Sequence, residues 1–377
     1  MAQHNALEKL THLERPQKGM INIMPLQTGS ILTDAARQAL MEFADGYSVC
    51  DFCQGRLTDI ANPPVKQFVH DLLPDFLGCD VAALTYGARD GIFMVFHTLV
   101  KPGDTIVVDR NRHYSTAVAA ERTGAVLAPV PHSGPPEYIL DVEGYDAVIR
   151  EHKPAMALVT YPDGKYGNVP DAARVGEICQ AAGVPLIVNG AYAVGRMPVS
   201  MKDLNADFII GSGHKSMASA GPSGVLGMKA QWQERVLRIS EESKKKEVEC
   251  LGCTLRGAPL VTLMASFPEV QERVQHWDEQ VAKAQWFSAR MEELGFEQLG
   301  EKPHRHDLMV FVTDRFYEIS QTVRERGFFL YKELKDRGIW GIQPGQTRTM
   351  KVSTYAATRE QLEVVLEAFS DILEKYR

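Results

Sequence analysis

Short runs of apolar residues alternate with longer amphipathic stretches through the first two thirds of the chain. Continuous apolar runs, bounded by polar or glycine-containing turns, occur at 81–86, 105–109, 125–130, 155–161, 185–189, 207–211 and 223–228. Helical patterns such as 88–99 and 171–182 separate several of these runs. Continuous apolar strands that alternate with helices are typical of a mainly parallel sheet buried on both faces. The pattern therefore predicts an α/β fold with a mainly parallel seven-stranded sheet.

The flanking regions predict further helices and a second, smaller domain. Thr33 and Asp34 are suitable residues for the start of a helix that runs to about Gly46. Apolar periodicity or high charge predicts other helices at 63–77, 230–250, 260–294 and 358–376, with strands near 308–312 and 349–353. We therefore expect an N-terminal arm (1–20), a large domain (21–245) and a small C-terminal α/β domain (246–377).

Composition narrows the class of protein. The chain has 377 residues, of which 45% are hydrophobic and 24% are charged, as in ordinary globular proteins. No apolar run approaches the roughly 20 residues that cross a bilayer, and the polar N-terminal residues do not resemble a secretory signal. We therefore expect a cytoplasmic protein with no membrane association. The net charge of −7 argues against a protein that coats nucleic acid and leaves only local basic patches for such contacts.

One lysine follows an apolar strand in a turn of small residues. The segment Ser212-Gly213-His214-Lys215-Ser216 comes directly after the run 207–211. Such a turn delivers an amine to the carboxyl edge of the sheet, where a desolvated lysine forms a Schiff base readily. A surface lysine in a loop is the alternative, and two companion motifs argue against it.

The companions provide a phosphate site and a contact for a pyridine ring. Gly87, Ala88 and Arg89 join a strand to a helix, and the free N–H groups of a helix N-terminus bind phosphate. Asn189 ends another strand, where fold-type I pyridoxal-phosphate (PLP) enzymes usually place an aspartate beside the pyridine nitrogen. Along the chain, the phosphate-binding turn comes first, the residue at the pyridine nitrogen second and the Ser-x-x-Lys segment third. Fold-type I PLP enzymes have the same order. The sequence therefore predicts PLP bound through Lys215.

Two further residues refine this hypothesis. His113 follows the strand 105–109 and is expected to stack on the face of the cofactor, although an exposed loop histidine is the alternative. The amide of Asn189 cannot keep the pyridine nitrogen protonated, so the ring is a weaker electron sink than usual. The weaker electron sink should slow transamination most. Elimination of a good β leaving group should be slowed less, because the negative charge departs with that group.

Four of the six cysteines form two C-x-x-C pairs, Cys50 with Cys53 and Cys250 with Cys253. Such pairs bind zinc, ligate an iron–sulfur cluster, or carry sulfur as a persulfide. Coincidence is a fourth interpretation. The neighbouring Arg56 and Arg256 favour thiolates. The lone Cys79 and Cys179 are expected to be small buried hydrophobic residues.

These motifs resemble the archaeal O-phosphoseryl-tRNA:cysteinyl-tRNA synthases from about Met20 onward. The most specific segments are VCDFCQGR (49–56), TYGARDG (85–91), DRNRHYST (109–116), VNGAYAVGR (188–196), GSGHKSMASAGPSGVLG (211–227) and LGCTLRGA (251–258). The resemblance implies a fold-type I PLP transferase whose important cysteines are Cys50, Cys53 and Cys253, either as sulfur carriers or as ligands of an iron–sulfur cluster. Cys250 lies outside the family pattern.

The resemblance also implies a reaction and partners. O-phosphoseryl-tRNA(Cys) would lose phosphate by β-elimination and gain sulfur, with Lys215 as the base at Cα and Arg89 at the leaving phosphate. Ser212, Gly213 and His214 would complete the cofactor phosphate site. A homodimer, O-phosphoseryl-tRNA synthetase as a partner and a sulfur donor of unknown identity are also expected. The alternatives are a cysteine desulfurase or lyase that acts on a free amino acid, and a non-catalytic RNA adaptor, which would not need Lys215.

Overall fold

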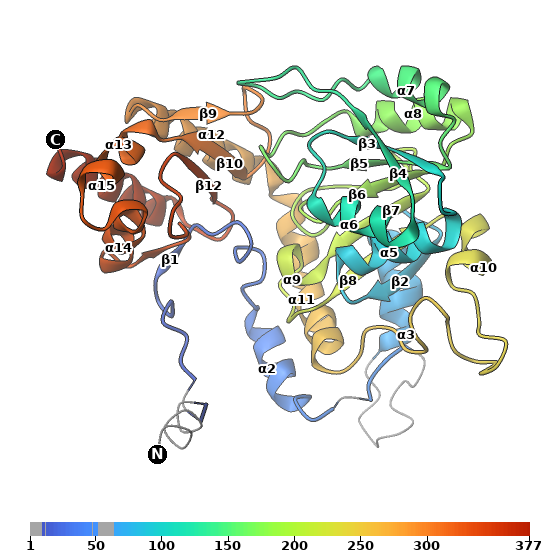
Figure 1. Ribbon diagram of the computed structural model, residues 1–377. Helices are drawn as coiled ribbons and strands as arrows, with labels where there is room; N and C mark the ends of the chain where they lie inside the picture. Colours follow the sequence, from blue (N-terminus) through green and yellow to red (C-terminus); the bar gives the residue numbers. More distant parts are fainter. Residues whose placement is uncertain (1–9, 12, 47, 52–63) are drawn as a thin grey trace, which may run out of the picture.

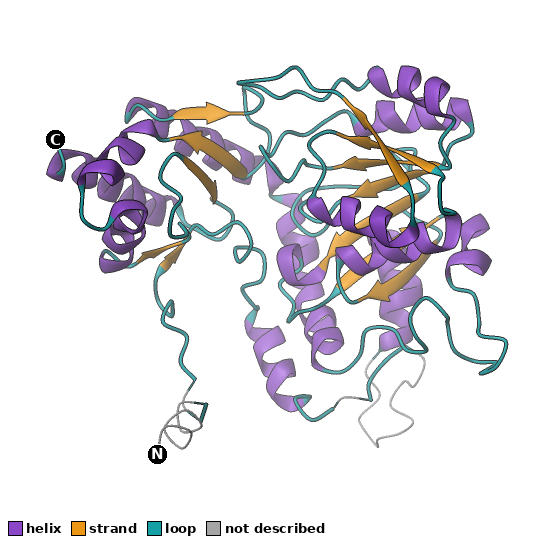
Figure 2. Ribbon diagram, viewed as in Figure 1, coloured by secondary structure: helices purple, strands orange, loops and turns teal. Residues whose placement is uncertain are grey.

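The computed structural model describes residues 10–11, 13–46, 48–51 and 64–377. Its centre is a seven-stranded sheet in the order β2-β8-β7-β6-β5-β3-β4, formed by β2 (Val81–Thr85), β3 (Thr105–Asp109), β4 (Val126–Val130), β5 (Met156–Thr160), β6 (Leu186–Asn189), β7 (Phe208–Ser212) and β8 (Gly224–Met228). Only β8 is antiparallel to its neighbours β2 and β7. All seven predicted strands and the mainly parallel sheet are confirmed (Figures 1 and 2).

Alternate side chains of the strands pack against helices on opposite faces of this sheet. In β3, Val107 belongs to one buried cluster, while Ile106 and Val108 belong to the other. Burial on both faces explains why the sequence shows continuous apolar runs rather than alternation. The surrounding helices are α2 (Asp34–Glu42), α3 (Val65–Gln67) with a π-helical turn (Phe68–Leu72) and α4 (Leu73–Leu77), α5 (Ala88–Leu99), α6 (Tyr114–Thr123), α7 (Gly144–His152), α8 (Ala172–Ala182), α9 (Gly213–Ser216), α10 (Gln233–Val236) and α11 (Ala258–Gln275).

The smaller C-terminal unit (Figure 1) has a separate hydrophobic cluster of its own. Its elements are α12 (Trp277–Glu293), β9 (Glu297–Leu299), β10 (Leu308–Val312), α13 (Asp314–Thr322), α14 (Phe329–Asp336), β11 (Ile339–Trp340), β12 (Thr349–Ser353) and α15 (Arg359–Lys375). The predicted strands near 308–312 and 349–353 and the final helix are confirmed. The predicted helical region 260–294 is the pair α11 and α12. The division of the chain at 245 and 246 stays a prediction.

The N-terminal segment connects the two units. β1 (Ile21–Asn22) pairs in parallel with β11, and Ile23 is buried in the C-terminal cluster. The chain then passes the lysine turn, where the Gly29 carbonyl accepts a hydrogen bond from Ala218 N at 3.0 Å. It continues into α2, which begins at the N-cap Thr33 as predicted and packs on α11. This N-terminal segment (21–42) therefore reaches from the small unit to the large one.

The prediction of a helix over 230–250 was wrong. A 3₁₀ turn (Ala230–Trp232) and α10 end at Val236, and turns follow up to α11. The Ser240 hydroxyl accepts from Ser243 N, and the Ser243 hydroxyl accepts from Lys246 N. Serine side chains that bond neighbouring amides compete with helix formation, which explains the difference. Helices α6, α7, α13 and α14 were not predicted.

No helix within the described residues has both the length and the apolar character that a membrane span needs.

Candidate active site

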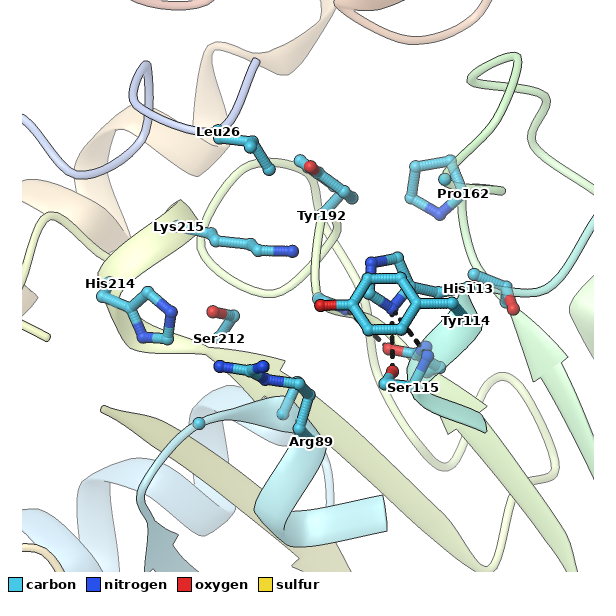
Figure 3. Close-up of a pocket in the computed structure, with 16 residues that line it drawn as sticks. Leu26, Arg89, His113, Tyr114, Ser115, Pro162, Tyr192, Ser212, His214 and Lys215 are labelled. Carbon is cyan, nitrogen blue, oxygen red and sulfur yellow. Dashed lines mark hydrogen bonds between the residues drawn. The ribbon is translucent and has the colours of Figure 1, made fainter. Parts of the chain in front are cut away.

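A cavity of about 270 Å³ lies at the carboxyl edge of the sheet. The predicted residues Gly87, Ala88, Arg89, His113, Asn189, Ser212, His214 and Lys215 line it, together with Leu26, Tyr114, Ser115, Thr160, Pro162, Gly164, Ala191 and Tyr192. These residues follow the ends of β2, β3, β5, β6 and β7, because parallel strands end at the same edge of a sheet. The structure therefore brings together residues that lie more than 120 positions apart (Figure 3).

Lys215 extends into this cavity from the short helix α9 (Figure 3). Its Nζ lies 4.7 Å from the ring centroid of Tyr192. Burial, together with the charges of Lys351, Arg196 and Arg89, lowers the pKa of Lys215 to about 8. A substantial fraction of neutral amine is therefore present near neutral pH, as a nucleophile or base requires.

One corner of the cavity is built to hold an anion. Helix α5 begins there at Gly87, whose φ of 118° is strained for other residues and where a Cβ would lie 3.2 Å from His214 Cε1. Arg89, Ser212 and His214 converge on this corner (Figure 3). The Ser212 hydroxyl is buried and has no hydrogen-bond partner among the described residues. Free helix N–H groups, a guanidinium and an unpartnered hydroxyl suit a phosphate group.

Gly213 does not belong to the described lining of the cavity. It packs behind the lining, where a Cβ would approach the hydroxyls of Ser223 and Ser219 at 2.6 and 2.8 Å. The residue thus allows the lysine turn to pack against Ser219 and Ser223.

His113 and Asn189 line other parts of the cavity. His113 caps α6 and accepts a hydrogen bond from Ser115 N at 3.2 Å through Nδ1. Burial and the charges of Lys215, Lys351 and Arg89 lower the pKa of His113 to about 4, so its ring is neutral near pH 7. Asn189 is 3% exposed, and its Oδ1 accepts from Ala191 N at 3.4 Å. A neutral ring and a buried amide are compatible with the predicted contacts to a cofactor.

Cys50 and Cys253 lie outside the described lining of the cavity. Cys50 forms an isolated antiparallel bridge with Arg256, and Gly257 N donates to Val49 O at 2.7 Å. The segment after Cys253 contacts the residue that precedes Gly87, because the Tyr86 hydroxyl donates to Thr254 O at 3.1 Å. The fold thus brings Cys50 beside the segment that carries Cys253, although 200 residues separate them.

The two cysteines of the second pair have different surroundings. Lys246 Nζ donates a hydrogen bond to Cys253 Sγ at 3.6 Å. Burial and the neighbouring Glu247 raise the pKa of the Cys250 thiol far above its usual value. Cys253 therefore has a cationic neighbour, whereas Cys250 stays protonated. Cys79 and Cys179 are buried, which confirms the prediction for both.

Cys53 and Arg56 lie outside the described residues. Within the described part of the chain, no three His, Cys, Asp or Glu side chains are arranged to hold a metal ion. The predicted cluster of Cys50, Cys53 and Cys253 is not tested by this observation, because one of its members lies outside that part.

Sequence reasoning missed several residues near Lys215. Tyr192 lies in the segment VNGAYAVGR (188–196), and no role was predicted for it, although its ring faces the Lys215 ammonium. Arg196 and Asp307 form a buried ion pair at 2.8 Å, and Arg196 Nε donates to the Ser216 hydroxyl at 3.2 Å. Asp307 and Lys351 come from the C-terminal unit, and no local motif marks them.

The fold and the site together define a class of enzyme. The apo structure of cysteine desulfurase from Thermococcus onnurineus matches with a TM-score of 0.75 at 16% identity, covering 95% of this chain and 96% of that one. At this identity the likeness shows the fold alone, which is that of fold-type I PLP enzymes. The predicted fold class is confirmed.

Closer relatives show the family. The family model described as O-phosphoseryl-tRNA(Sec) selenium transferase, SepSecS, matches residues 44–374. An O-phospho-L-seryl-tRNA:Cys-tRNA synthase from Methanosarcina acetivorans is 56% identical over 378 residues, covering 99% of this chain and 98% of that one. The crystal structure of a SepCysS–SepCysE N-terminal domain complex matches with a TM-score of 0.91 at 44% identity over 99% of both chains. The chain belongs to the O-phospho-L-seryl-tRNA:Cys-tRNA synthase family, as its motifs predicted, and is an enzyme of the PLP-dependent transferase type.

Proposed function

We propose that this enzyme converts O-phosphoseryl-tRNA(Cys) to cysteinyl-tRNA(Cys) by β-elimination of phosphate and β-addition of sulfur, with PLP as its cofactor. The supporting observation is a cavity that holds a low-pKa lysine and an anion-binding corner in a member of this family. No aspartate or glutamate lines the cavity among the described residues, so nothing there repels a phosphorylated substrate.

The residues of the cavity fit the cofactor. Gly87, Ala88, Ser212 and His214 would hold its phosphate at the start of α5, the unpartnered Ser212 hydroxyl supplying a donor. Asn189 would face the pyridine nitrogen, and His113 would cover one face of the ring. When bound, PLP supplies an electron sink that weakens the bond between Cα and its proton.

The protein residues would perform the proton and phosphate steps. The neutral Lys215 amine would take the Cα proton, for which its lowered pKa is suited. The Arg89 guanidinium, which points into the cavity beside Ser212, would bind the departing phosphate (Figure 3). With sulfide as the donor, replacement of phosphate by sulfur involves no net oxidation or reduction.

The sulfur chemistry belongs to Cys50, Cys53 and Cys253 in this proposal. The ammonium of Lys246 donates a hydrogen bond to Cys253 Sγ, and a cationic neighbour is typical of cysteines that transfer sulfur. The three cysteines would either hold an iron–sulfur cluster or carry sulfur as a persulfide. In the second case a neighbouring thiol would supply the two electrons that reduce the outer sulfur, and the resulting disulfide would be reduced by an external thiol. Iron and sulfide analysis of anaerobically purified protein distinguishes these two roles.

We further propose a cytoplasmic homodimer that receives its substrate from an O-phosphoseryl-tRNA synthetase. The crystallised relative is a complex with the N-terminal domain of SepCysE, which supports an equivalent partner for this chain.

Loss of a sulfur-handling cysteine should separate phosphate release from cysteine formation. We expect Cys50→Ala, Cys53→Ala and Cys253→Ala each to lose cysteinyl-tRNA formation while phosphate release from O-phosphoseryl-tRNA persists at least in part. Elimination requires the cavity around Lys215, whereas sulfur addition also requires a nucleophile at Cβ. The measurement is the yield of both products for each variant, with a persulfide donor.

Cys250→Ala is the matched control, because its buried thiol stays protonated beside Glu247. It should retain both activities. Normal cysteinyl-tRNA formation by the Cys50 or Cys53 variant would contradict a sulfur-carrier role. If wild-type enzyme with sulfide releases no phosphate from O-phosphoseryl-tRNA, the proposed function itself is wrong.

Replacing the amide near the pyridine nitrogen should change reaction specificity. Asn189→Asp introduces a carboxylate that favours a protonated ring, and we therefore expect more transamination relative to elimination and a shifted cofactor absorption band. Product ratios and spectra of the two proteins provide the test. If neither changes, Asn189 does not contact the pyridine nitrogen.

A further inference from the structure

Lys351 reaches the wall of the active-site cavity from the C-terminal unit. It lies in the middle of β12, where it pairs with Val310 of β10. Its side chain is mostly buried, and its Nζ donates a hydrogen bond to the carbonyl of Gly164, which lines the cavity near His113. A charged side chain from one unit thus ends at the cavity of the other.

The hydrogen bonding of Lys351 is incomplete. An ammonium group has three donors, and the only hydrogen bond that Nζ makes within the described part of the chain is to the neutral carbonyl of Gly164. Two donors remain for a ligand. Burial lowers the pKa of Lys351, and the charge of Asp163 raises it in part. Keeping the ammonium charged in this buried position therefore costs free energy, which a bound anion would offset.

Asp163 does not neutralise this charge fully. Its Oδ1 accepts from the backbone N–H groups of Lys165 and Tyr166, and its Oδ2 accepts from Asn111 Nδ2. Burial raises the pKa of this carboxyl to about 6, so it is mostly ionised at pH 7, but its hydrogen bonds go to these backbone and amide groups rather than to Lys351. The Lys351 charge also acts across the cavity, because it lowers the pKa of both His113 and Lys215.

Three cationic side chains therefore act on one small cavity, namely Arg89, Lys215 and Lys351. In the proposed function, Gly87, Ala88, Ser212 and His214 would hold the cofactor phosphate where α5 begins, and Arg89 would bind the departing phosphate. Lys351 is not itself among the described lining residues, but its Nζ bonds the carbonyl of Gly164, which lines the cavity beside His113. A substrate esterified to tRNA has no free α-carboxylate, and the remaining anionic group of its aminoacyl part is the phosphate esterified to Oγ.

We propose that Lys351 acts together with Arg89 in binding the phosphate of the phosphoseryl group, an assignment that rests on the proposed function. The phosphate would accept hydrogen bonds from the two remaining donors of Nζ. It would also neutralise the excess positive charge near Lys215 and His113. Because Lys351 is on β12, this contact would also link substrate binding to the position of the C-terminal unit. Lys351 is thus a substrate-binding residue that discriminates the phosphorylated substrate from seryl-tRNA.

The test compares Lys351→Met and Lys351→Arg with the control Lys283→Met. Lys283 is also a partly buried lysine whose pKa is lowered by burial, and it donates to a backbone carbonyl, that of Ala357, at 2.8 Å. The assays give KM and kcat for O-phosphoseryl-tRNA and inhibition by inorganic phosphate. Calorimetry measures binding of inorganic phosphate to the PLP-loaded enzyme.

We expect Lys351→Met to raise KM and weaken phosphate binding by about 10- to 100-fold, the range expected for loss of a charge-assisted hydrogen bond. Lys351→Arg should recover most of both, whereas Lys283→Met should change neither. The pKa of Lys215 should rise in Lys351→Met, because a positive neighbour is removed. A merely structural role would not produce this combination.

The outcomes separate this inference from the proposed function. If the wild type forms cysteinyl-tRNA but Lys351→Met keeps its KM and its phosphate inhibition, Lys351 does not bind the phosphate and the proposed function stands. If the wild type is inactive on O-phosphoseryl-tRNA and Lys351→Met instead loses affinity for free cysteine, both proposals fail. Lys351 is then a carboxylate site of a desulfurase.

Discussion

Lys215→Ala should lose covalent cofactor attachment and at least about 10⁴-fold of turnover, because one residue supplies both the attachment point and the base. Lys215→Arg should be similarly inactive, since a guanidinium keeps the positive charge but does not become a neutral nucleophile. Borohydride reduction followed by peptide mass analysis identifies the modified residue. Cofactor still fixed by reduction in the Lys215→Ala protein would assign the role to another lysine.

The lowered pKa of Lys215 gives this result a pH dependence. Only the neutral amine attacks a carbonyl, and at pH 7 a pKa of about 8 leaves roughly 10% of the side chain neutral, compared with about 0.03% for an ordinary lysine. The rate at which the apoprotein captures PLP should therefore rise as the pH increases through about 8 and then level off. A rate that continues to rise toward pH 10 would show that Lys215 has an ordinary pKa.

Asp307→Ala should destabilise the enzyme by about 3–5 kcal/mol, because it leaves the fully buried Arg196 without its counter-ion. Burial alone would disfavour ionised Asp307, but the charges of Arg196 and His306 outweigh it and hold the pKa of this carboxyl well below its usual range. The ion pair joins the lysine turn to β10. Denaturant unfolding of the apoprotein, followed by circular dichroism, measures the loss.

Two controls accompany this measurement. Glu143→Gln breaks the exposed ion pair with Arg174 and should have little effect, because solvent screens surface pairs. The double variant Arg196→Met with Asp307→Leu should recover much of the stability, since it removes both members of this ion pair. An Asp307→Ala protein as stable as the Glu143→Gln protein would show that water or another group compensates Arg196.

The strands and the lysine turn were predictable because their signals are local. A strand buried on both faces is a continuous apolar run, and the residues after such strands must meet at one edge of the sheet. Lys215, Asn189 and Gly87 were therefore placed together from the chain alone. The turns after Val236 were not predicted, because charge density does not reveal that Ser240 and Ser243 bond their neighbours' amides.

Contacts between the two units had no comparable signal. Lys351 lies 136 residues after Lys215, in a strand whose sequence shows only its own burial pattern. The pairing of Arg196 with Asp307 depends on how the two units pack together. The local periodicity of apolar residues does not predict that packing. Likewise, the bridge between Cys50 and Arg256 follows from packing of distant segments, so sequence alone left the arrangement of the cysteines open.

The path of the N-terminal segment has a consequence for folding during synthesis. Ile23 leaves the ribosome more than 250 residues before its buried neighbours, which span residues 284–373. The sheet of the large unit is complete once Met228 has emerged, and domains generally fold as they are synthesised. Ile23 and β1 must therefore wait, exposed, while more than a hundred further residues are translated. The C-terminal unit can close its core only after both ends of the chain have met, so late truncations should leave a folded sheet with an unprotected apolar N-terminal segment.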